Sequence, residues 1–137
     1  MKTKHVNKKM NENVFKLRRK VMNFVYEAKK IYPQMPRITI RITDCNKPEV
    51  LGTAGMNRNI IWIPESTLSK GDSTIRHVVF HELCHAIWGI QHNEKCPLMK
   101  TFLTIPCSKR QCYSIFKKYM KENELSPYRE ISFIFAA

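Results

Sequence analysis

Two histidines and a glutamate in the segment HELCH, residues 81–85, have the spacing of a zinc-dependent catalytic site. Residues four apart on a helix share one face, so His81 and His85 can each direct an imidazole nitrogen at one zinc ion. Glu82 projects about 100° further round the helix, where it can face metal-bound water without binding the metal. Zinc lowers the pKa of such water toward ~7, and the Glu82 carboxylate can take its proton during attack on a carbonyl. The H-E-x-x-H pattern therefore predicts a hydrolase with one catalytic zinc ion.

The residues around this motif favour a metal site over a chance match on an ordinary helix. Buried imidazole and carboxyl groups are costly in an apolar setting unless a metal or a partner satisfies them. His77 lies one turn before His81, but the outer histidines of the row 77-81-85 are ~12 Å apart on a helix, so His77 is expected to support the site or the fold. The expected helix is otherwise apolar, through Ile75, Val78, Val79, Phe80, Leu83, Ala86, Ile87 and Trp88.

A third zinc ligand is expected beyond the helix. A glutamate further along the chain, as in thermolysin-like sites, is excluded because no Asp or Glu lies between Glu94 and Glu122. His92 follows Gly89, a residue type that can end a helix and turn the chain back. His92 can therefore complete a three-histidine site with an open fourth position, and Glu94 is the other candidate.

The stretch HELCHAIWGIQHNEKCPLM, residues 81–99, resembles the metzincin zinc peptidases, whose pattern is H-E-x-x-H-x-x-G-x-x-H followed by a Met-turn. The resemblance implies that His81, His85 and His92 bind the zinc and that Glu82 is the general base. It also implies that Met99 lies beneath the zinc site. The glycine and the third histidine each fall one residue late here, so the end of the helix must accommodate one extra residue.

Among metzincins, the chain looks most like the archaemetzincins and matrixins. Archaemetzincins also carry a cysteine cluster for a second, structural zinc, and Cys96, Cys107 and Cys112 stand in comparable places. Their last pair is spaced C-x₄-C rather than C-x₂-C, and a closed structural site needs four ligands, so Cys84 or a histidine would have to join. The alternative is that the cysteines are buried free thiols.

A second resemblance is to the SprT-like zinc proteases, some of which act on protein bound to DNA. The segment MNRNIIWIPESTL, residues 56–68, resembles their approach to the H-E-x-x-H helix. The GHG context usual for their third histidine is missing here. The Met-turn-like CPLM, residues 96–99, favours the metzincins.

The first third of the chain is expected to supply one helix and a small sheet. Apolar residues recur at three and four from residue 11 or 13 to residue 31, which predicts a helix after a basic flexible arm of residues 1–10. Pro33 and Pro36 end this helix. Alternation predicts a strand over residues 37–43. A strand pair is expected over residues 50–56 and 59–63, joined near Asn57 and Arg58. The segment 52–57 (GTAGMN) is either an edge strand that binds substrate backbone or a plain hairpin.

The rest of the chain is expected to carry the active-site helix between loops. A loop over residues 64–73 precedes a helix from about residue 74 to 88, capped by Asp72 or Ser73 and ended by Gly89. A loop, a third helix and an extended apolar tail follow, over residues 91–106, 108–121 and 126–137. This order defines one α+β domain over residues 11–137. By the resemblance it is a minimal zincin- or metzincin-like domain, with a small mixed sheet, an active-site helix and flanking helices.

The charge of the chain indicates possible partners. There are 24 Lys and Arg against 11 Asp and Glu, a formal net charge of +13. A basic surface attracts nucleic acid or an acidic partner, but no nucleic-acid motif is present and the alternative is a solvated basic face. The basic residues concentrate in two places, at Lys16, Arg18, Arg19 and Lys20 and along residues 95–121.

Two functional hypotheses follow from the sequence. The first is a monomeric zinc metalloendopeptidase that hydrolyses protein or peptide substrates. The second is a non-catalytic, zinc-stabilised basic binding protein, in which a fourth ligand such as Cys96 closes the site. The chain shows no signal peptide and no apolar run long enough to span a membrane, so we expect an intracellular, cytoplasmic protein, for example a phage-type protein in its host.

Overall fold

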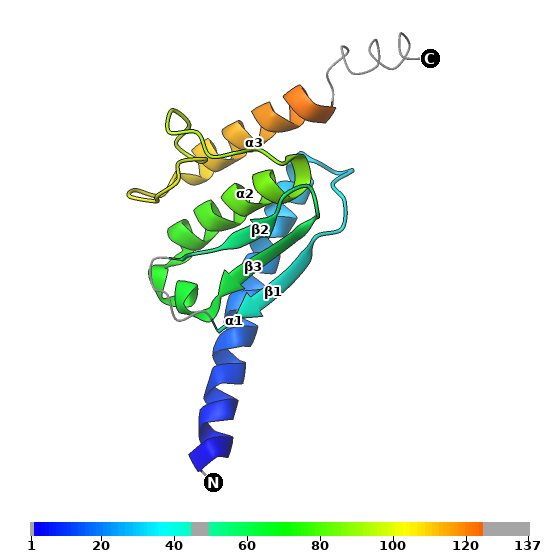
Figure 1. The fold of residues 1–137 in the computed structure, drawn as a ribbon. Helices are drawn as coiled ribbons and strands as arrows, with labels where there is room; N and C mark the ends of the chain where they lie inside the picture. The colour runs from blue at the N-terminus through cyan, green and yellow to red at the C-terminus, as the bar shows by residue number, and fades with distance from the viewer. Residues whose placement is uncertain (1, 45–49, 125–137) are drawn as a thin grey trace.

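The computed structural model describes the backbone of residues 2–44 and 50–124 and the side chains of residues 12–44 and 50–124. The fold is α+β, as expected, with helices packed on a small sheet (Figure 1). No helix in these ranges is long and apolar enough to cross a membrane. The elements in chain order are α1 (Lys2–Ile31), β1 (Thr39–Thr43), β2 (Thr53–Gly55), β3 (Ile60–Pro64), the 3-10 helix η1 (Glu65–Lys70), α2 (Asp72–Trp88) and α3 (Lys109–Glu124).

The sheet is mixed, with the strand order β1-β3-β2. β1 runs parallel to β3, with Thr39 opposite Ile60, and β2 runs antiparallel to β3, with Ala54 opposite Ile61. Ile61 and Ile63 are fully buried while Trp62 between them is half-buried, as the two-residue period of a strand requires. The expected strand pair is confirmed, and β2 is an edge strand.

The helix α1 packs on the sheet and on α2 through a stripe of apolar residues. Leu17, Val21 and Ala28 are spaced by four and seven residues and are fully buried. The half-buried Arg76 of α2 donates to Glu27 of α1, with 3.0 Å between Nε and Oε1. The expected start of α1 was wrong. The helix begins at Lys2 and covers residues 2–10, which were assigned to a flexible arm, because no glycine or proline interrupts the chain before Pro33.

The segment before α2 differs from the loop that was expected there. Residues 65–70 form η1, whose buried Thr67 donates its hydroxyl to the Leu51 carbonyl, with 2.9 Å between Oγ1 and O. The N-cap of α2 is Gly71, with φ 90° and no side-chain cap, so the expected cap at Asp72 or Ser73 was wrong. Asp72 instead pairs with Lys20 of α1 at 2.6 Å.

The helix α3 lies against α2 and is capped by residues at its own start. Ser108 Oγ accepts from the Gln111 N–H at 3.1 Å and Gln111 Oε1 accepts from the Ser108 N–H at 3.0 Å, which is a capping box. α3 continues to Glu124, beyond the expected end at residue 121, and Glu124 accepts a bond from Trp88 Nε1 at 2.9 Å. The expected extended tail, residues 126–137, lies outside the described residues.

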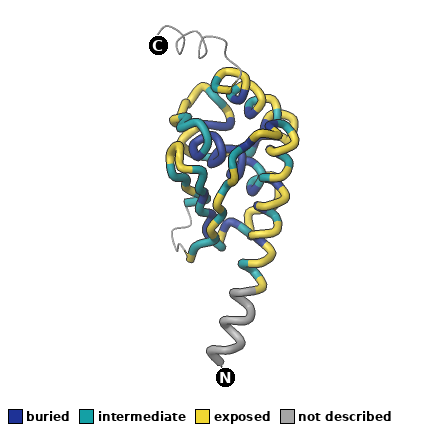
Figure 2. The backbone as a smooth tube through the Cα atoms, turned by 90° about the vertical axis from the view of Figure 1, so that its right-hand side faces the viewer, coloured by how far each residue is buried: buried dark blue, intermediate teal, exposed yellow. Residues whose placement is uncertain are grey.

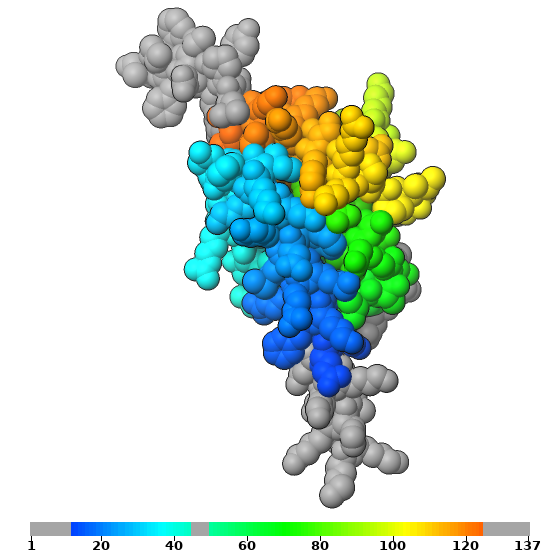
Figure 3. Space-filling view, turned by 180° about the vertical axis from the view of Figure 1, so that it is seen from behind, coloured from blue at the N-terminus to red at the C-terminus, as the bar shows by residue number. Residues whose placement is uncertain are grey.

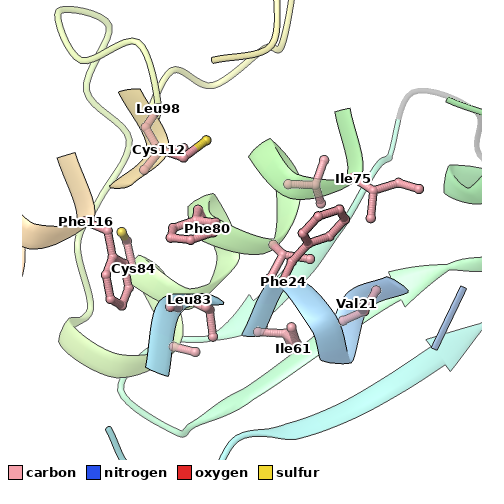
Figure 4. Close-up of a cluster of buried hydrophobic side chains, with 14 of the residues drawn as sticks. Val21, Phe24, Ile61, Ile75, Phe80, Leu83, Cys84, Leu98, Cys112 and Phe116 are labelled. Carbon is pink, nitrogen blue, oxygen red and sulfur yellow. The ribbon is translucent and has the colours of Figure 1, made fainter. Parts of the chain in front are cut away.

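The core surrounds α2, which is the central element of the fold. Its buried side chains meet those of α1 and the sheet on one side and those of α3 on the other (Figure 4). Phe80 contacts Phe116 edge to face at 5.4 Å between ring centroids. Buried residues lie in the interior and exposed ones along the outer faces of the helices (Figure 2). Each fully buried large apolar side chain contributes about 1.5–3 kcal/mol to the stability of the fold. This packing holds α2, and the side chains that it carries, in a fixed position.

Candidate metal centre

His81 and His85 lie in the middle of α2 and bring their imidazoles together. Both are buried, with 8% and 7% of their surfaces exposed. Their Nε2 atoms are 3.1 Å apart and their rings meet edge to face at 4.7 Å between centroids. The expected sharing of one helix face is confirmed.

Backbone carbonyls fix the protonation of both rings. His81 Nδ1 lies 2.6 Å from the Leu98 carbonyl oxygen, and His85 Nδ1 contacts the Ile90 carbonyl oxygen. Because a carbonyl only accepts, each neutral ring carries its proton on Nδ1 and a lone pair on Nε2. Two Nε2 lone pairs at 3.1 Å repel each other unless a cation lies between them.

Burial disfavours protonation of the His81 and His85 rings at Nε2. It lowers the pKa of His81 to about 4, and it also lowers the pKa of His85. Both imidazoles are therefore neutral near pH 7, the form that binds a metal. Ligating histidines typically donate the other ring N–H to a carbonyl or carboxylate, so the donor set fits a metal ion.

His92 is the third member of the group, and it is exposed. Its ring centroid lies 5.2 Å from that of His81 and 4.9 Å from that of His85. One ligand atom from each of the three histidines lies within 4.8 Å of the others, so the group can hold a metal ion. Glu94, the alternative third ligand, instead accepts from the backbone N–H and the hydroxyl of Thr101, at 3.0 and 2.5 Å.

The end of α2 accommodates the residue that makes the third histidine late. Gly89 takes the left-handed conformation, with φ 64°, as expected. Its N–H donates to the His85 carbonyl at 3.0 Å, which is the αL type of helix end, and the Ile90 N–H donates to the Cys84 carbonyl at 3.2 Å. This turn places the Ile90 carbonyl against His85 Nδ1 and sends the chain toward His92.

The turn between β2 and β3 holds the end of α2 in place, and this attachment was not predicted from the sequence. The Asn57 N–H donates to the His85 carbonyl at 3.1 Å and the Asn59 N–H donates to the Ala86 carbonyl at 3.0 Å. Both asparagines have positive φ, 60° and 57°, a conformation in which Asn is enriched. The pattern N-R-N was a usable signal for the turn, but not for its attachment to α2.

Glu82 is buried beside the three histidines, with 5% of its surface exposed. Burial raises the pKa of its carboxyl to about 8. Gly52, just before β2, leaves room for it, because a Cβ there would lie 3.1 Å from Glu82 Cγ and 2.8 Å from Val78 Cγ1. Glu82 thus lies between the histidines and the first residues of the edge strand.

The segment with Met99 packs next to His81. Met99 is fully buried, its N–H donates to the Cys96 carbonyl at 3.1 Å and its carbonyl accepts from the Asn93 N–H at 2.8 Å. The residue before it, Leu98, supplies the carbonyl that holds His81. The turn is therefore part of the support of the centre, and the position of Met99 beneath a zinc ion stays a prediction.

The cysteines do not form a second metal group within the part of the chain that the structure describes. There, the three histidines are the only His, Cys, Asp and Glu side chains that converge in this way. Cys84, Cys96, Cys107 and Cys112 are free thiols, and Tyr119 donates its hydroxyl to Cys96 Sγ at 3.5 Å. The expected second zinc at Cys96, Cys107 and Cys112 is therefore not built from described residues.

His77 has a role different from that of the other two α2 histidines. Its ring stacks on that of His81 at 6.3 Å between centroids, and its Nδ1 accepts the Cys107 N–H at 2.9 Å. It is buried and stands outside the metal group. His77 links α2 to the start of α3, as expected of a supporting residue.

Two hollows open beside the centre. One, of about 430 Å³, begins at His81 and Glu82 and extends between Lys70 and the loop after Met99. The other, of about 440 Å³, follows β2 past His85 and His92. Glu82 lines both hollows, so an extended polymer lying along β2 would pass the Glu82 carboxyl and the histidines.

Exposed basic residues lie on two of the helices, α1 and α3. Figure 3 shows α1 running across one face of the molecule, with α3 at one end of it. Lys16, Arg18 and Arg19 are exposed on α1, while Lys20 is engaged by Asp72. The basic residues of α3 are also exposed, at Lys109, Arg110, Lys117, Lys118 and Lys121.

Comparisons of the chain with protein-family models, with curated proteins and with solved structures find no match. The case for a function therefore depends on the geometry of this chain. That geometry is a three-histidine group with a buried carboxyl beside it, on the central helix of an α+β fold.

Proposed function

We propose that this chain is a zinc-dependent metallopeptidase of a minimal metzincin-like kind. One observation carries the proposal: the Nε2 atoms of His81 and His85 face each other at 3.1 Å while carbonyls occupy both Nδ1 atoms. Neutral imidazoles bind zinc, copper, iron and nickel, and the H-E-x-x-H spacing favours zinc among them. His81, His85 and His92 would hold the ion.

An open site favours catalysis over a purely structural role. Structural zinc sites are closed by four protein ligands, whereas catalytic sites keep one position for water or substrate. Among the described residues no fourth His, Cys, Asp or Glu joins the group, and the exposed His92 leaves one side accessible. When bound, zinc supplies Lewis acidity that acidifies water and polarises a carbonyl.

Glu82 is the general base in this proposal. It follows His81 directly and lines both hollows, so its oxygens can reach a water molecule at the edge of the histidine group. A cation beside a carboxyl favours the ionised form, which accepts a proton from water and can pass it to the leaving amine. Burial raises the pKa of the Glu82 carboxyl to about 8 when no ion is bound. In the same low-polarity surroundings, the charge of a bound zinc ion would act strongly on this carboxyl and lower its pKa.

The edge strand β2 is the proposed binding site for the substrate backbone. It pairs with β3 along one edge, and Thr53 and Ala54 line the hollow that also contains His85 and His92. An extended peptide can add to such an edge by main-chain hydrogen bonds. The peptide would then lie across Glu82 and the histidines.

Glu82→Gln tests the mechanism because it keeps the shape of the side chain and removes the base. We expect wild-type protein purified without chelator to contain about one zinc per chain and to cleave unfolded protein or peptides. Glu82→Gln should keep the zinc and lose cleavage by about 10²-fold or more, while His92→Ala should lose zinc. Lys117→Ala, on the exposed face of α3, is the control. An undiminished cleavage rate in Glu82→Gln would refute the mechanism.

A further inference from the structure

We propose that the 430 Å³ cleft beside His81 and Glu82 binds an acidic side chain of the substrate, next to the bond that is cut. This inference deepens the proposed function and rests on it, because it takes the chain to be a peptidase with a peptide substrate. It follows from which groups line the cleft and from which of them are already engaged.

The cleft begins at the site of chemistry. His81, Glu82 and Gly52 line its inner end. Gly52 is adjacent to β2, the edge strand, and Glu82 is in van der Waals reach of any Cβ placed on it. A side chain that enters here therefore belongs to a residue that flanks the reacting bond.

Two lysines give the cleft its charge. Lys70 comes from the end of η1 and Lys100 follows the Met99 turn, and both are exposed. Neither lysine lies within ion-pair distance of a described carboxylate, and Lys100 interacts at longer range with Glu94, which stands outside the cleft lining. The one carboxyl among the lining residues is Glu82, at the inner end, so the outer part of the cleft is positive.

The wall between the lysines offers hydrogen-bond donors. His77 Nδ1 accepts the Cys107 N–H at 2.9 Å, so the proton of the neutral ring is on Nε2 and that nitrogen can only donate. The hydroxyl of Thr104 also lines the cleft, while that of Thr101 is used by Glu94.

A carboxylate is the side-chain group that such a lining selects. It accepts hydrogen bonds and donates none, and it carries the charge that two lysines attract. A Lys or Arg side chain would instead meet two like charges and a fixed donor. The apolar residues of the cleft can cover the methylenes of Glu or Asp; they are Leu51, Val78, Phe102, Leu103 and Pro106.

The test compares a charge reversal in the cleft with the same reversal elsewhere. Wild type, Lys70→Glu/Lys100→Glu and the control Lys117→Glu/Lys121→Glu each digest a peptide library, and the cut sites are sequenced. We expect wild type to prefer Asp or Glu over Lys or Arg at one position beside the cut, by about fivefold or more. The cleft variant should lose or reverse this preference and the control should keep it. Higher ionic strength should reduce it.

A binding measurement separates failure of this inference from failure of the proposed function. Labelled peptides that differ only by Glu or Lys are titrated onto zinc-loaded Glu82→Gln protein, with and without the cleft substitutions, and fluorescence anisotropy is read. Tighter binding of the Glu peptide that depends on Lys70 and Lys100 supports the inference, even if wild type cleaves nothing. Equal binding of both peptides, or a preference unchanged by the cleft substitutions, overturns it, whether or not cleavage occurs.

Discussion

Gly89→Ala is the substitution that most directly tests how the metal centre is positioned. Gly89 has φ 64°, which costs an alanine about 1–2 kcal/mol. A Cβ there would also overlap the side-chain amide of Asn57, with its Cγ only 2.9 Å away. Forcing a neighbour to move costs about 1–3 kcal/mol more. We therefore expect Gly89→Ala to lower the free energy of unfolding of the zinc-free protein by about 2–4 kcal/mol.

The same substitution should weaken zinc binding, because Gly89 sets the position of the Ile90 carbonyl that holds His85 Nδ1. Loss of such an outer partner typically costs 10–100-fold in metal affinity. Unfolding in urea measures the first effect, and competition with a chromogenic chelator measures the second. Asn57→Gly combined with Gly89→Ala removes the overlap without adding strain at the positive φ of residue 57, and should recover about 1 kcal/mol or more of the stability.

Gly71→Ala is the matched control. Gly71 also has positive φ, 90°, but no atom lies within 4 Å of the Cβ position, and it stands at the opposite end of α2. It should lose about 1–3 kcal/mol from backbone strain alone and keep the zinc affinity of wild type. The reasoning is refuted if Gly89→Ala unfolds like wild type, or if both glycine variants change zinc affinity equally.

Three further predictions concern other parts of the fold. His77→Leu leaves the buried Cys107 N–H without its acceptor and should cost about 1–3 kcal/mol in urea unfolding at neutral pH, whereas His77→Gln, which can accept that bond, should cost less. Because the pKa of His77 is lowered to about 4, the protein should lose stability as pH falls from 6.5 toward 4, and His77→Gln should lose less; parallel pH profiles would contradict this. The pKa of Glu82 is instead raised, to about 8, which reverses the pH dependence. Without zinc, the free energy of unfolding should fall as pH rises from 4.5 toward 8. Glu82→Gln should therefore be more stable than wild type by more than ~1 kcal/mol at pH 8, and added zinc should diminish this difference. Phe116→Ala removes a fully buried ring from the α2–α3 contact and should cost about 3–5 kcal/mol, and a zinc affinity that falls as steeply as in His92→Ala would show that the centre depends on α3.

The local features of the site could be predicted from the sequence because each depends on the spacing of a few residues. A spacing of four residues on a helix brings His81 and His85 together, and Gly89 can take the left-handed conformation that commonly ends a helix. The strand pair was predicted from the two short runs on either side of Asn57, while the choice between a substrate-binding edge strand and a plain hairpin stayed open. These signals operate within one turn or one hairpin, so distant parts of the chain do not change them.

The support of the site could not be predicted, because backbone groups supply it. The carbonyls of Leu98 and Ile90 hold the two histidines, and the N–H of Cys107 holds His77. Any residue type offers a carbonyl, and nearly any offers an N–H, so no residue pattern marks these partners. The first part of α1, residues 2–10, and the 3-10 helix η1 were missed because neither carries a positive signal in the sequence.

The one extra residue before the third histidine can be explained by these backbone contacts. α2 continues to Trp88 before Gly89 turns the chain, and the carbonyls exposed at this end are taken up by the hairpin turn, His85 O by Asn57 and Ala86 O by Asn59. The turn after Gly89 then presents the Ile90 carbonyl to His85, while the loop beyond it returns Leu98 to His81. An extra residue is tolerated because the helix end is fixed from both sides, by the hairpin and by the returning loop. We infer that the ligand geometry depends on these backbone contacts more than on the number of residues between the second and third histidines.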